Sequence, residues 1–145
     1  MMDRQQTAEL YEQILRHCGA AESALRALSR WARQQEIAQD MAELRRQYRQ
    51  IALEAEGGLQ ITQGRPTPVK RRLYQSSLQM HCKMILDHSP ANLARLVIRG
   101  FQAGEHRFGD YRRVYINAED EAAALCARLL EMQRMQKLRF RRYLN

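Results

Sequence analysis

The sequence predicts an all-α protein, a single domain over residues 1–145 in which four main helices form a bundle. Apolar residues recur at steps of three and four in four long stretches, the spacing that places them on one face of a helix. Between the second and third stretches, residues 57–68 are rich in glycine and proline and disfavour helix. Because short connections make antiparallel neighbours, we expect two antiparallel helical hairpins joined by a long crossover.

The first hairpin is expected from helices over residues 7–31 and 35–56. Thr7 can serve as the N-cap of the first helix, since its hydroxyl can accept a hydrogen bond from an early backbone N–H. Gly57 and Gly58 follow the last periodic residue of the second helix, and glycine there favours a left-handed C-terminal cap. We therefore expect the second helix to end before this pair. The two apolar seams are Leu10, Ile14, Cys18, Ala21, Leu25, Leu28 and Ala32, then Ile37, Met41, Leu44, Tyr48, Ile51 and Ala55.

The second hairpin is expected after a crossover that contains a short extra helix over residues 69–86. Ser89 can cap the next helix and Pro90 is favoured at a first helical position, so the third main helix is expected over residues 90–116. Asn117 is the expected cap of the last helix, which continues to the C-terminus. Its basic last turns suit the negative end of the helix dipole.

Three glycines lie inside the expected third helix, at Gly100, Gly104 and Gly109, where each costs roughly 1 kcal/mol relative to alanine. Gly104 falls on the apolar side of that helix. We expect a neighbouring helix or a bulky side chain to approach it closely.

The first and third helices share one short motif, a small residue followed by a glutamate, which is Glu22 in the first and Glu105 in the third. Di-metal carboxylate bundles place single glutamates on two helices and Glu-x-x-His on the other two. This chain contains no Glu-x-x-His, and the fourth helix carries Glu131 with Arg134 in the histidine position. A guanidinium cannot ligate a cation. The three glutamates are therefore interpreted as a degenerate metal site, and we expect no metal or other cofactor.

Glu22 and Glu105 are instead expected to be structural carboxylates that pair with arginine or with tyrosine hydroxyls, because a buried carboxylate must be paired or protonated. His17 and His88 are expected at the surface or at helix ends. The sequence holds no serine elbow, no phosphate-binding glycine loop and no cysteine with an evident positioned base. It therefore does not point to an enzyme.

The chain carries 24 Lys and Arg against 16 Asp and Glu, a formal net charge of +8. Such a balance favours polyanions or acidic proteins as partners. The basic clusters interleave aromatics, as surfaces that bind phosphates and stack bases do. These aromatics coincide with the bundle seams, however, so core packing is the favoured interpretation and an acidic protein is preferred over nucleic acid. The candidate partner-binding residues are Arg45, Arg46, Arg49, Lys70, Arg71, Arg72, Arg139, Arg141 and Arg142.

The cysteines indicate a reducing compartment. Cys18, Cys82 and Cys126 are odd in number, form no C-x-x-C pair and sit in apolar runs, which suits buried structural thiols. The first residues lack the apolar region of a signal peptide, and no run reaches the roughly 18 apolar residues of a membrane span. We expect a cytoplasmic protein without membrane contact.

Two segments resemble a known family. Residues 13–26, with Gly19-Ala20-Ala21-Glu22 at their centre, and residues 102–112, with Gly104-Glu105-His106, are similar to the first and third helices of ferritin-like four-helix-bundle domains of bacteria, whose function is unknown. The resemblance implies the ferritin-like fold, a cytoplasmic setting, self-association as a homodimer and a stress-related role. It implies no reaction.

The favoured functional hypothesis is a non-enzymatic scaffold or interaction protein that meets acidic partners through its arginine-rich surface. Two alternatives stay open. The first is a divergent metal-binding or oxidoreductase bundle that uses Glu22, Glu105 and Glu131. The second is a nucleic-acid-binding bundle that uses the basic clusters.

Overall fold

A computed structural model describes residues 3–63 and 87–144 of the chain. Within these ranges every regular element is a helix and no strand occurs, so the prediction of an all-α protein with four main helices is confirmed. The expected short helix over residues 69–86 lies outside the described residues. The elements are α1 (Arg4–Ser29), α2 (Gln35–Gln63), α4 (Pro90–Phe108), the single turn α5 (Tyr111–Val114), α6 (Asp120–Arg141) and the 3-10 turn η2 (Arg142–Leu144).

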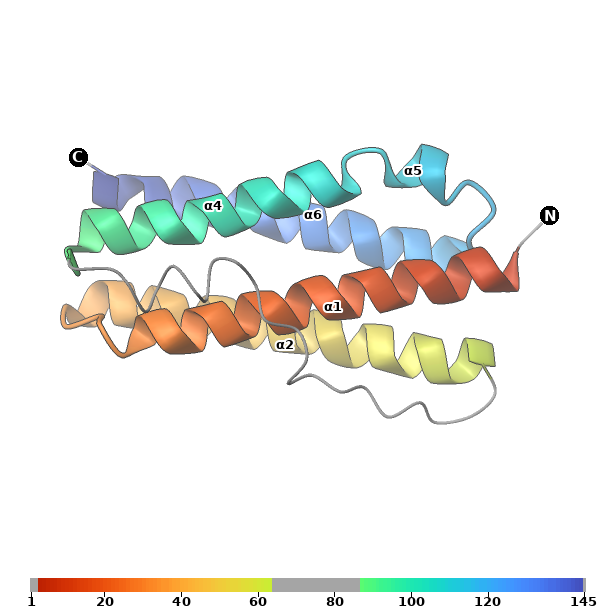
Figure 1. The fold of residues 1–145 in the computed structure, drawn as a ribbon, viewed down its shortest axis with the longest axis horizontal. Coiled ribbons are helices and arrows are strands. Elements are labelled where there is room, and N and C mark those ends of the chain that lie inside the picture. Colours follow the sequence, from red (N-terminus) through yellow and green to blue (C-terminus); the bar gives the residue numbers. More distant parts are fainter. Residues whose placement is uncertain (1–2, 64–86, 145) are drawn as a thin grey trace.

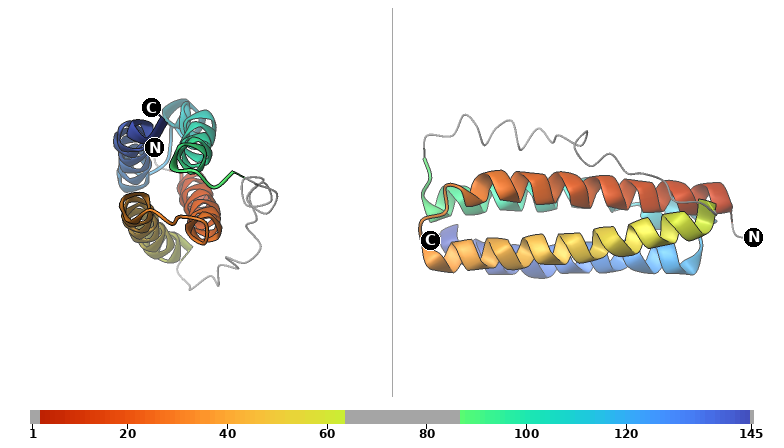
Figure 2. Two further views of the ribbon diagram at one scale, coloured as in Figure 1. Left: turned by 90° about the vertical axis from the view of Figure 1, so that its left-hand side faces the viewer. Right: turned by 90° about the horizontal axis from the view of Figure 1, so that it is seen from below.

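The four long helices lie side by side along one axis (Figure 1). α1 and α2 run antiparallel, as do α4 and α6, whereas α2 and α4 run in the same direction, so that α2 ends at the opposite end of the bundle from the start of α4. Seen end-on, α1, α2, α6 and α4 occupy four corners in that cyclic order (Figure 2). The core between them consists of the apolar seams of all four helices.

The start of α1 differs from the prediction. Asp3 is the N-cap residue, and its carboxylate accepts from the backbone N–H of Gln5 and of Gln6. Thr7 is instead fully buried within the helix, where its hydroxyl donates to the carbonyl of Asp3 at 2.9 Å and accepts from the backbone N–H of Glu119, also at 2.9 Å. The threonine therefore caps the last helix rather than the first.

The prediction that α2 ends before the glycine pair is wrong. The helix continues through Gly57 and Gly58 to Gln63, because Leu59 prolongs the buried seam. Gly58 has a steric reason, since a Cβ there would lie 2.3 Å from Cζ of Tyr11. The tyrosine ring lies directly against the helix backbone. At Gly57, by contrast, a Cβ would meet no atom of the described residues within 4 Å.

The start of α4 matches the prediction and its end does not. The hydroxyl of Ser89 accepts from the backbone N–H of Asn92 at 3.2 Å, and Pro90 opens the helix. The helix ends at Phe108, eight residues before the predicted boundary at Ile116, and the chain forms the separate turn α5 before α6. α4 is therefore shorter than its antiparallel neighbour α6.

The last helix begins two residues later than predicted, with Glu119 rather than Asn117 as its N-cap residue. Asn117 instead forms hydrogen bonds with the first residues of the α1 segment. Its carbonyl accepts from the backbone N–H of Asp3 at 2.6 Å, and its own N–H donates to the side chain of Gln6 at 2.9 Å. Among the described residues, no helix combines the length and apolar character that crossing a membrane requires.

Candidate functional site

Three polar side chains meet in the middle of the bundle. His17 of α1 and Tyr48 of α2 both contact the side-chain carbonyl oxygen of Gln133 on α6: the distance from Nε2 of His17 to Oε1 of Gln133 is 2.7 Å, and that from Oη of Tyr48 is also 2.7 Å. All three side chains are buried. We call them the central node.

Helix α4 leaves room for the central node, because it has a glycine, Gly104, at that level. A Cβ at Gly104 would lie 2.4 Å from Nε2 of Gln133 and 2.8 Å from Nε2 of His17. The ring of Phe108, one turn further along α4, meets the His17 imidazole edge to face at a centroid distance of 5.5 Å. The expected close approach at Gly104 is thus confirmed, and its cause is a pair of polar side chains.

The central node is uncharged at neutral pH. A carbonyl oxygen only accepts, so both Tyr48 Oη and His17 Nε2 must donate to Gln133, which fixes the His17 tautomer. Burial lowers the pKa of His17, although its hydrogen bond to Gln133 opposes this change, and burial raises the pKa of Tyr48 well above its ordinary value. The expected surface position of His17 is therefore wrong. It lies next to Cys18 on α1, within the width of the apolar stripe.

The two cysteines of the described ranges are free thiols in the core. Cys18 and Cys126 are fully buried. Burial raises the pKa of the Cys18 thiol far above neutral and that of Cys126 to about 12. Since the thiolate is the nucleophile, both residues are unreactive packing groups at neutral pH. Cys82 lies outside the described residues.

The three glutamates of the degenerate metal site lie apart from the central node. Glu22 is largely buried at the α1–α2 edge, where Arg49 holds Oε1 with Nη2 at 2.8 Å and Nε at 3.1 Å, so its predicted pairing with arginine is confirmed. The same prediction is wrong for Glu105, which is half exposed and pairs with a lysine, Lys137, whose Nζ lies at 3.5 Å.

Glu131 faces solvent on α6, where it pairs with Arg134. In residues 3–63 and 87–144, no three His, Cys, Asp or Glu side chains gather closely enough to hold a metal ion. The inward position on this turn of α6 belongs to Gln133, four residues after Leu129 on the buried seam. That spacing is the sequence signal that could have identified it.

Several arginines of the predicted partner surface are already paired. Arg46 binds Glu43 with two nitrogens, at 2.6 and 2.9 Å, and Arg49 binds Glu22. Arg142 lies 2.5 Å from Asp40 and 3.1 Å from Glu36.

The other predicted arginines differ from one another in exposure. Arg139 lies 3.9 Å from Asp40 and Arg45 is partly buried, whereas Arg141 is exposed and forms no ion pair within the described ranges. The triplet Lys70-Arg71-Arg72 lies outside the described residues. Among the predicted arginines that the structure describes, Arg141 is the one that is both exposed and without an ion pair to a described residue.

The charge of the described chain is polarised along the bundle, with the central node as the dividing level. On one side lie 12 basic and 5 acidic residues, and on the other 7 basic and 11 acidic residues. We call the two sides the basic end, residues 18–47, 87–103 and 134–144, and the acidic end, residues 3–16, 49–63 and 105–132.

The basic end holds five exposed arginines that form no ion pair among the described residues. They come from three parts of the chain: the α1–α2 connection, the outer side of α4 and the end of α6. Between them, the Trp31 ring stacks on the His88 ring with centroids 4.0 Å apart and planes 15° from parallel, which ties the α1–α2 connection to the start of α4. The five are Arg30, Arg33, Arg95, Arg99 and Arg141.

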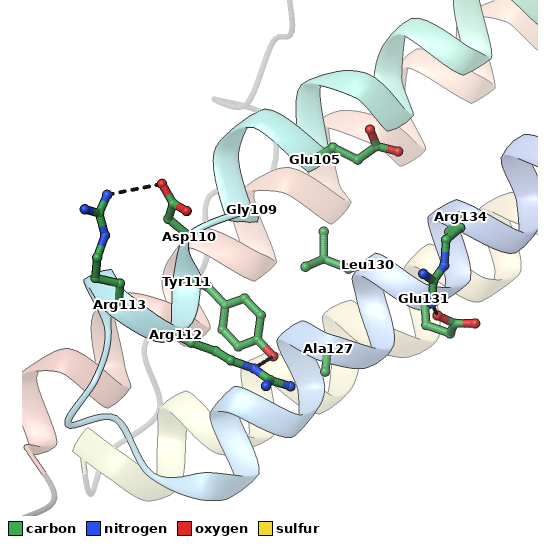
Figure 3. Close-up of a pocket in the computed structure, with 10 residues that line it drawn as sticks. All are labelled: Glu105, Gly109, Asp110, Tyr111, Arg112, Arg113, Ala127, Leu130, Glu131 and Arg134. Atoms are coloured by element: carbon green, nitrogen blue, oxygen red, sulfur yellow. Dashed lines mark hydrogen bonds and ion pairs between the residues drawn. The ribbon is translucent and has the colours of Figure 1, made fainter.

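A second feature that the sequence did not predict is a groove of about 620 Å³ between the end of α4, α5 and α6 (Figure 3). It lies where α4 ends at Phe108 and the chain turns into α5, beside the middle turns of α6. Ala127 and Leu130 form its apolar floor. Its rim is electrically balanced, since Arg113 binds Asp110 at 3.2 Å and Arg134 binds Glu131.

Comparison of the chain with protein-family models, with characterised proteins and with solved structures found no match. The resemblance to ferritin-like domains therefore stays a prediction.

Proposed function

We propose that the protein is a non-catalytic interaction module whose basic end binds an acidic protein partner. The observation that supports this proposal is the set of five exposed arginines, none in a close ion pair with another described residue, that three separate segments bring to one end of the bundle. Unpaired surface cations raise the local potential and attract acidic groups at long range. Guanidinium groups also bind carboxylates in a bidentate geometry.

The central node supports a structural role for the interior rather than a catalytic one. Its hydrogen bonds join α1, α2 and α6, and Gly104 closes it against α4. The groups involved are neutral and buried, and polar networks of this kind specify how helices pack. We therefore assign partner binding to the surface of the bundle rather than to its interior.

A protein partner is preferred over nucleic acid because, among the described residues, most aromatic rings that accompany the arginines are buried or already stacked. Tyr48 and Phe140 are fully buried, and the ring of Trp31 is already stacked on His88. Proteins that bind single strands offer several exposed aromatic faces along a basic groove. The metal-dependent alternative lacks support, since Glu22, Glu105 and Glu131 each pair with a different basic side chain.

We extend the proposal to the fold family and the cellular location of the protein. We infer a ferritin-like bundle from the parallel course of α2 and α4, which a long crossover between two hairpins requires. We infer a cytoplasmic location from the buried free thiols of Cys18 and Cys126, which suit a reducing compartment.

The test compares two variants of equal charge. Arg95→Glu with Arg99→Glu reverses two charges at the basic end, and Arg112→Glu with Arg113→Glu reverses two at the acidic end. The probe is a glutamate-rich peptide of about 20 residues, followed by fluorescence anisotropy at low salt, where charge attraction is least screened. We expect the first variant to lose at least about tenfold in affinity and the second less than about twofold.

The same measurement with a single-stranded oligonucleotide of equal charge separates the two partner classes. Tighter binding of the oligonucleotide than of the peptide, with the steep salt dependence of phosphate contacts, would favour the nucleic-acid alternative. Equal losses in both variants would show that only net charge matters and would reject the basic end as a site.

A further inference from the structure

Two grooves meet at α5, at the acidic end of the bundle. The larger is the groove of about 620 Å³ between the end of α4, α5 and α6, and a second groove, of about 300 Å³, runs between α5 and the first turns of α6. Tyr111, Arg112 and Ala127 line both grooves. We call these three residues the junction.

The Tyr111 side chain orients the arginine of the junction. Its ring is only 7% exposed, and Figure 3 shows Tyr111 and Arg112 both directed from α5 toward α6. The hydroxyl oxygen of Tyr111 accepts a hydrogen bond from Nε of Arg112 at 2.9 Å. Because this bond already restricts the exposed arginine side chain, a ligand that binds to it loses less conformational entropy.

The junction has hydrogen-bond donors without a partner among the described residues. Arg112 forms no ion pair there, and its bond through Nε leaves both Nη amino groups available. The oxygen of Tyr111 accepts from Arg112, so the hydrogen of its hydroxyl can be donated to another group. The two Nη groups of a guanidinium match the two oxygens of a carboxylate.

The acidic residues around the grooves do not neutralise Arg112. Those that line the larger groove each pair with another basic side chain, and Asp120, in the lining of the smaller one, lies in the first turn of α6, where the helix dipole favours a carboxylate. Charges elsewhere at the acidic end act weakly, since salt screens them beyond about 8 Å. The pairs of the larger groove are Glu105 with Lys137, Asp110 with Arg113 and Glu131 with Arg134.

The surface next to the donors is apolar. Ala127 and Leu130 form the floor of the larger groove, and Ile116, which is 72% exposed, lines the smaller one. The larger volume lies within the range of roughly 300 to 1,000 Å³ that is typical of clefts for small organic molecules. Such clefts combine an apolar lining with a few polar groups that orient the ligand, as Arg112 and Tyr111 do here.

We propose that the junction binds a small organic acid with an apolar chain, of the class of medium-chain fatty acids. The carboxylate pairs with Arg112 and accepts from the Tyr111 hydroxyl, and the chain lies over Ala127 and Leu130. The inference does not depend on the proposed function, because the junction lies at the opposite end of the bundle from the basic end. A glutamate-rich peptide also lacks the apolar chain that the groove requires.

The test is a titration of the full chain with octanoate, followed through the amide chemical shifts of the isotope-labelled protein. We expect saturable shifts in residues 109–115 and 123–130, and none in residues 30–33 or 95–99. Octanol keeps the chain without the carboxylate, and acetate keeps the carboxylate without the chain. Each should bind at least about tenfold more weakly than octanoate, because the site uses both parts of the ligand.

Substitutions at the junction separate charge, hydrogen bond and space. Arg112→Gln should weaken octanoate binding at least about tenfold, whereas Arg113→Gln, the matched control, should change it less than about twofold, because Arg113 lines the same groove but pairs with Asp110. Tyr111→Phe keeps the ring and should weaken binding about fivefold. Ala127→Gln fills the floor and should weaken binding by a similar factor, about fivefold. Circular dichroism checks that each variant keeps its helix content.

Several results would overturn the proposal. Octanol that binds as tightly as octanoate would indicate apolar adsorption alone, and equal losses in Arg112→Gln and Arg113→Gln would indicate that only net charge matters. Shifts confined to the basic end, or no saturable shift up to the solubility of octanoate, would also reject the site. If a peptide with a C-terminal leucine shifted these residues and octanoate did not, the junction would belong to a protein terminus instead.

Discussion

The central node and the basic end use polar residues in opposite ways. In the central node, His17, Tyr48 and Gln133 are buried, neutral and hydrogen-bonded to one another. At the basic end, arginines such as Arg95 and Arg99 are charged, exposed and form no close ion pair among the described residues. Buried polar groups are costly to disturb, whereas isolated surface charges contribute little to stability. The comparison separates the residues that hold the bundle together from those available for binding.

The largest effect is expected at Gly104. In Gly104→Leu, the new side chain would collide with Gln133 and His17, whose side chains are buried and fixed by hydrogen bonds. We expect the free energy of unfolding in urea to fall by about 3 kcal/mol, the upper part of the usual range for overpacking. Gly57→Leu is the control, since a Cβ there would meet no described atom within 4 Å, and it should change the free energy of unfolding by less than about 1 kcal/mol.

Gln133→Leu should follow in size. The substitution removes the one oxygen to which both Tyr48 and His17 donate, and it leaves two buried donors unsatisfied. We expect a loss of about 2 kcal/mol in urea unfolding, reduced somewhat because the Nε2 of Gln133 has no hydrogen-bond partner within the described residues. Gln102→Leu, at an exposed position of α4, should change stability by less than about 0.5 kcal/mol. Equal losses would mean that the central node contributes nothing specific.

A smaller effect is expected from pH. Because burial lowers the pKa of His17 from its ordinary value near 6.5, the unfolded chain takes up this proton at a higher pH than the folded one. The contribution of neutral His17 to the free energy of unfolding should be fully present above about pH 6.5. Below that pH it should decline, until the pKa of His17 in the folded protein is reached, with a slope of at most about 1.4 kcal/mol per pH unit. Urea unfolding at several pH values measures the slope.

His17→Gln should flatten this pH dependence, whatever it does to stability at pH 7. His106→Gln, which changes an exposed histidine on α4, should leave the slope as it is. If both variants kept the slope, titration of the central node would not be its source.

The smallest effect is expected at the basic end. Replacing Arg95 and Arg99 together with glutamine should change the free energy of unfolding by less than about 0.5 kcal/mol, because neither side chain is buried or paired in the described chain. Urea unfolding next to the natural sequence measures the change. A loss as large as that of Gln133→Leu would erase the distinction between the two regions.

Residues with a strong local signal were placed correctly from the sequence. The seams of all four helices, the Ser89-Pro90 start of α4 and the close approach at Gly104 follow from spacing, capping chemistry and the cost of an internal glycine. These features depend on neighbours within a few positions along the chain. Their physics can therefore be evaluated without knowing the tertiary structure.

Residues whose role depends on a distant partner were misplaced. Gly58 looked like a helix end because nothing in the local sequence reveals the ring of Tyr11 beside it. His17 looked like a surface residue because its partner, Gln133, lies 116 positions away. The polarisation of charge could not be found either, since it appears only when four separate segments are aligned along one axis.

The contact between Thr7 and Glu119 has a consequence for biosynthesis. The first helix contributes the group that completes the start of the last one, across 112 positions of sequence. During synthesis, Thr7 therefore leaves the ribosome 112 residues before the helix whose start it completes. This contact necessarily forms late, because the four-helix bundle cannot finish folding before α6 has been synthesised.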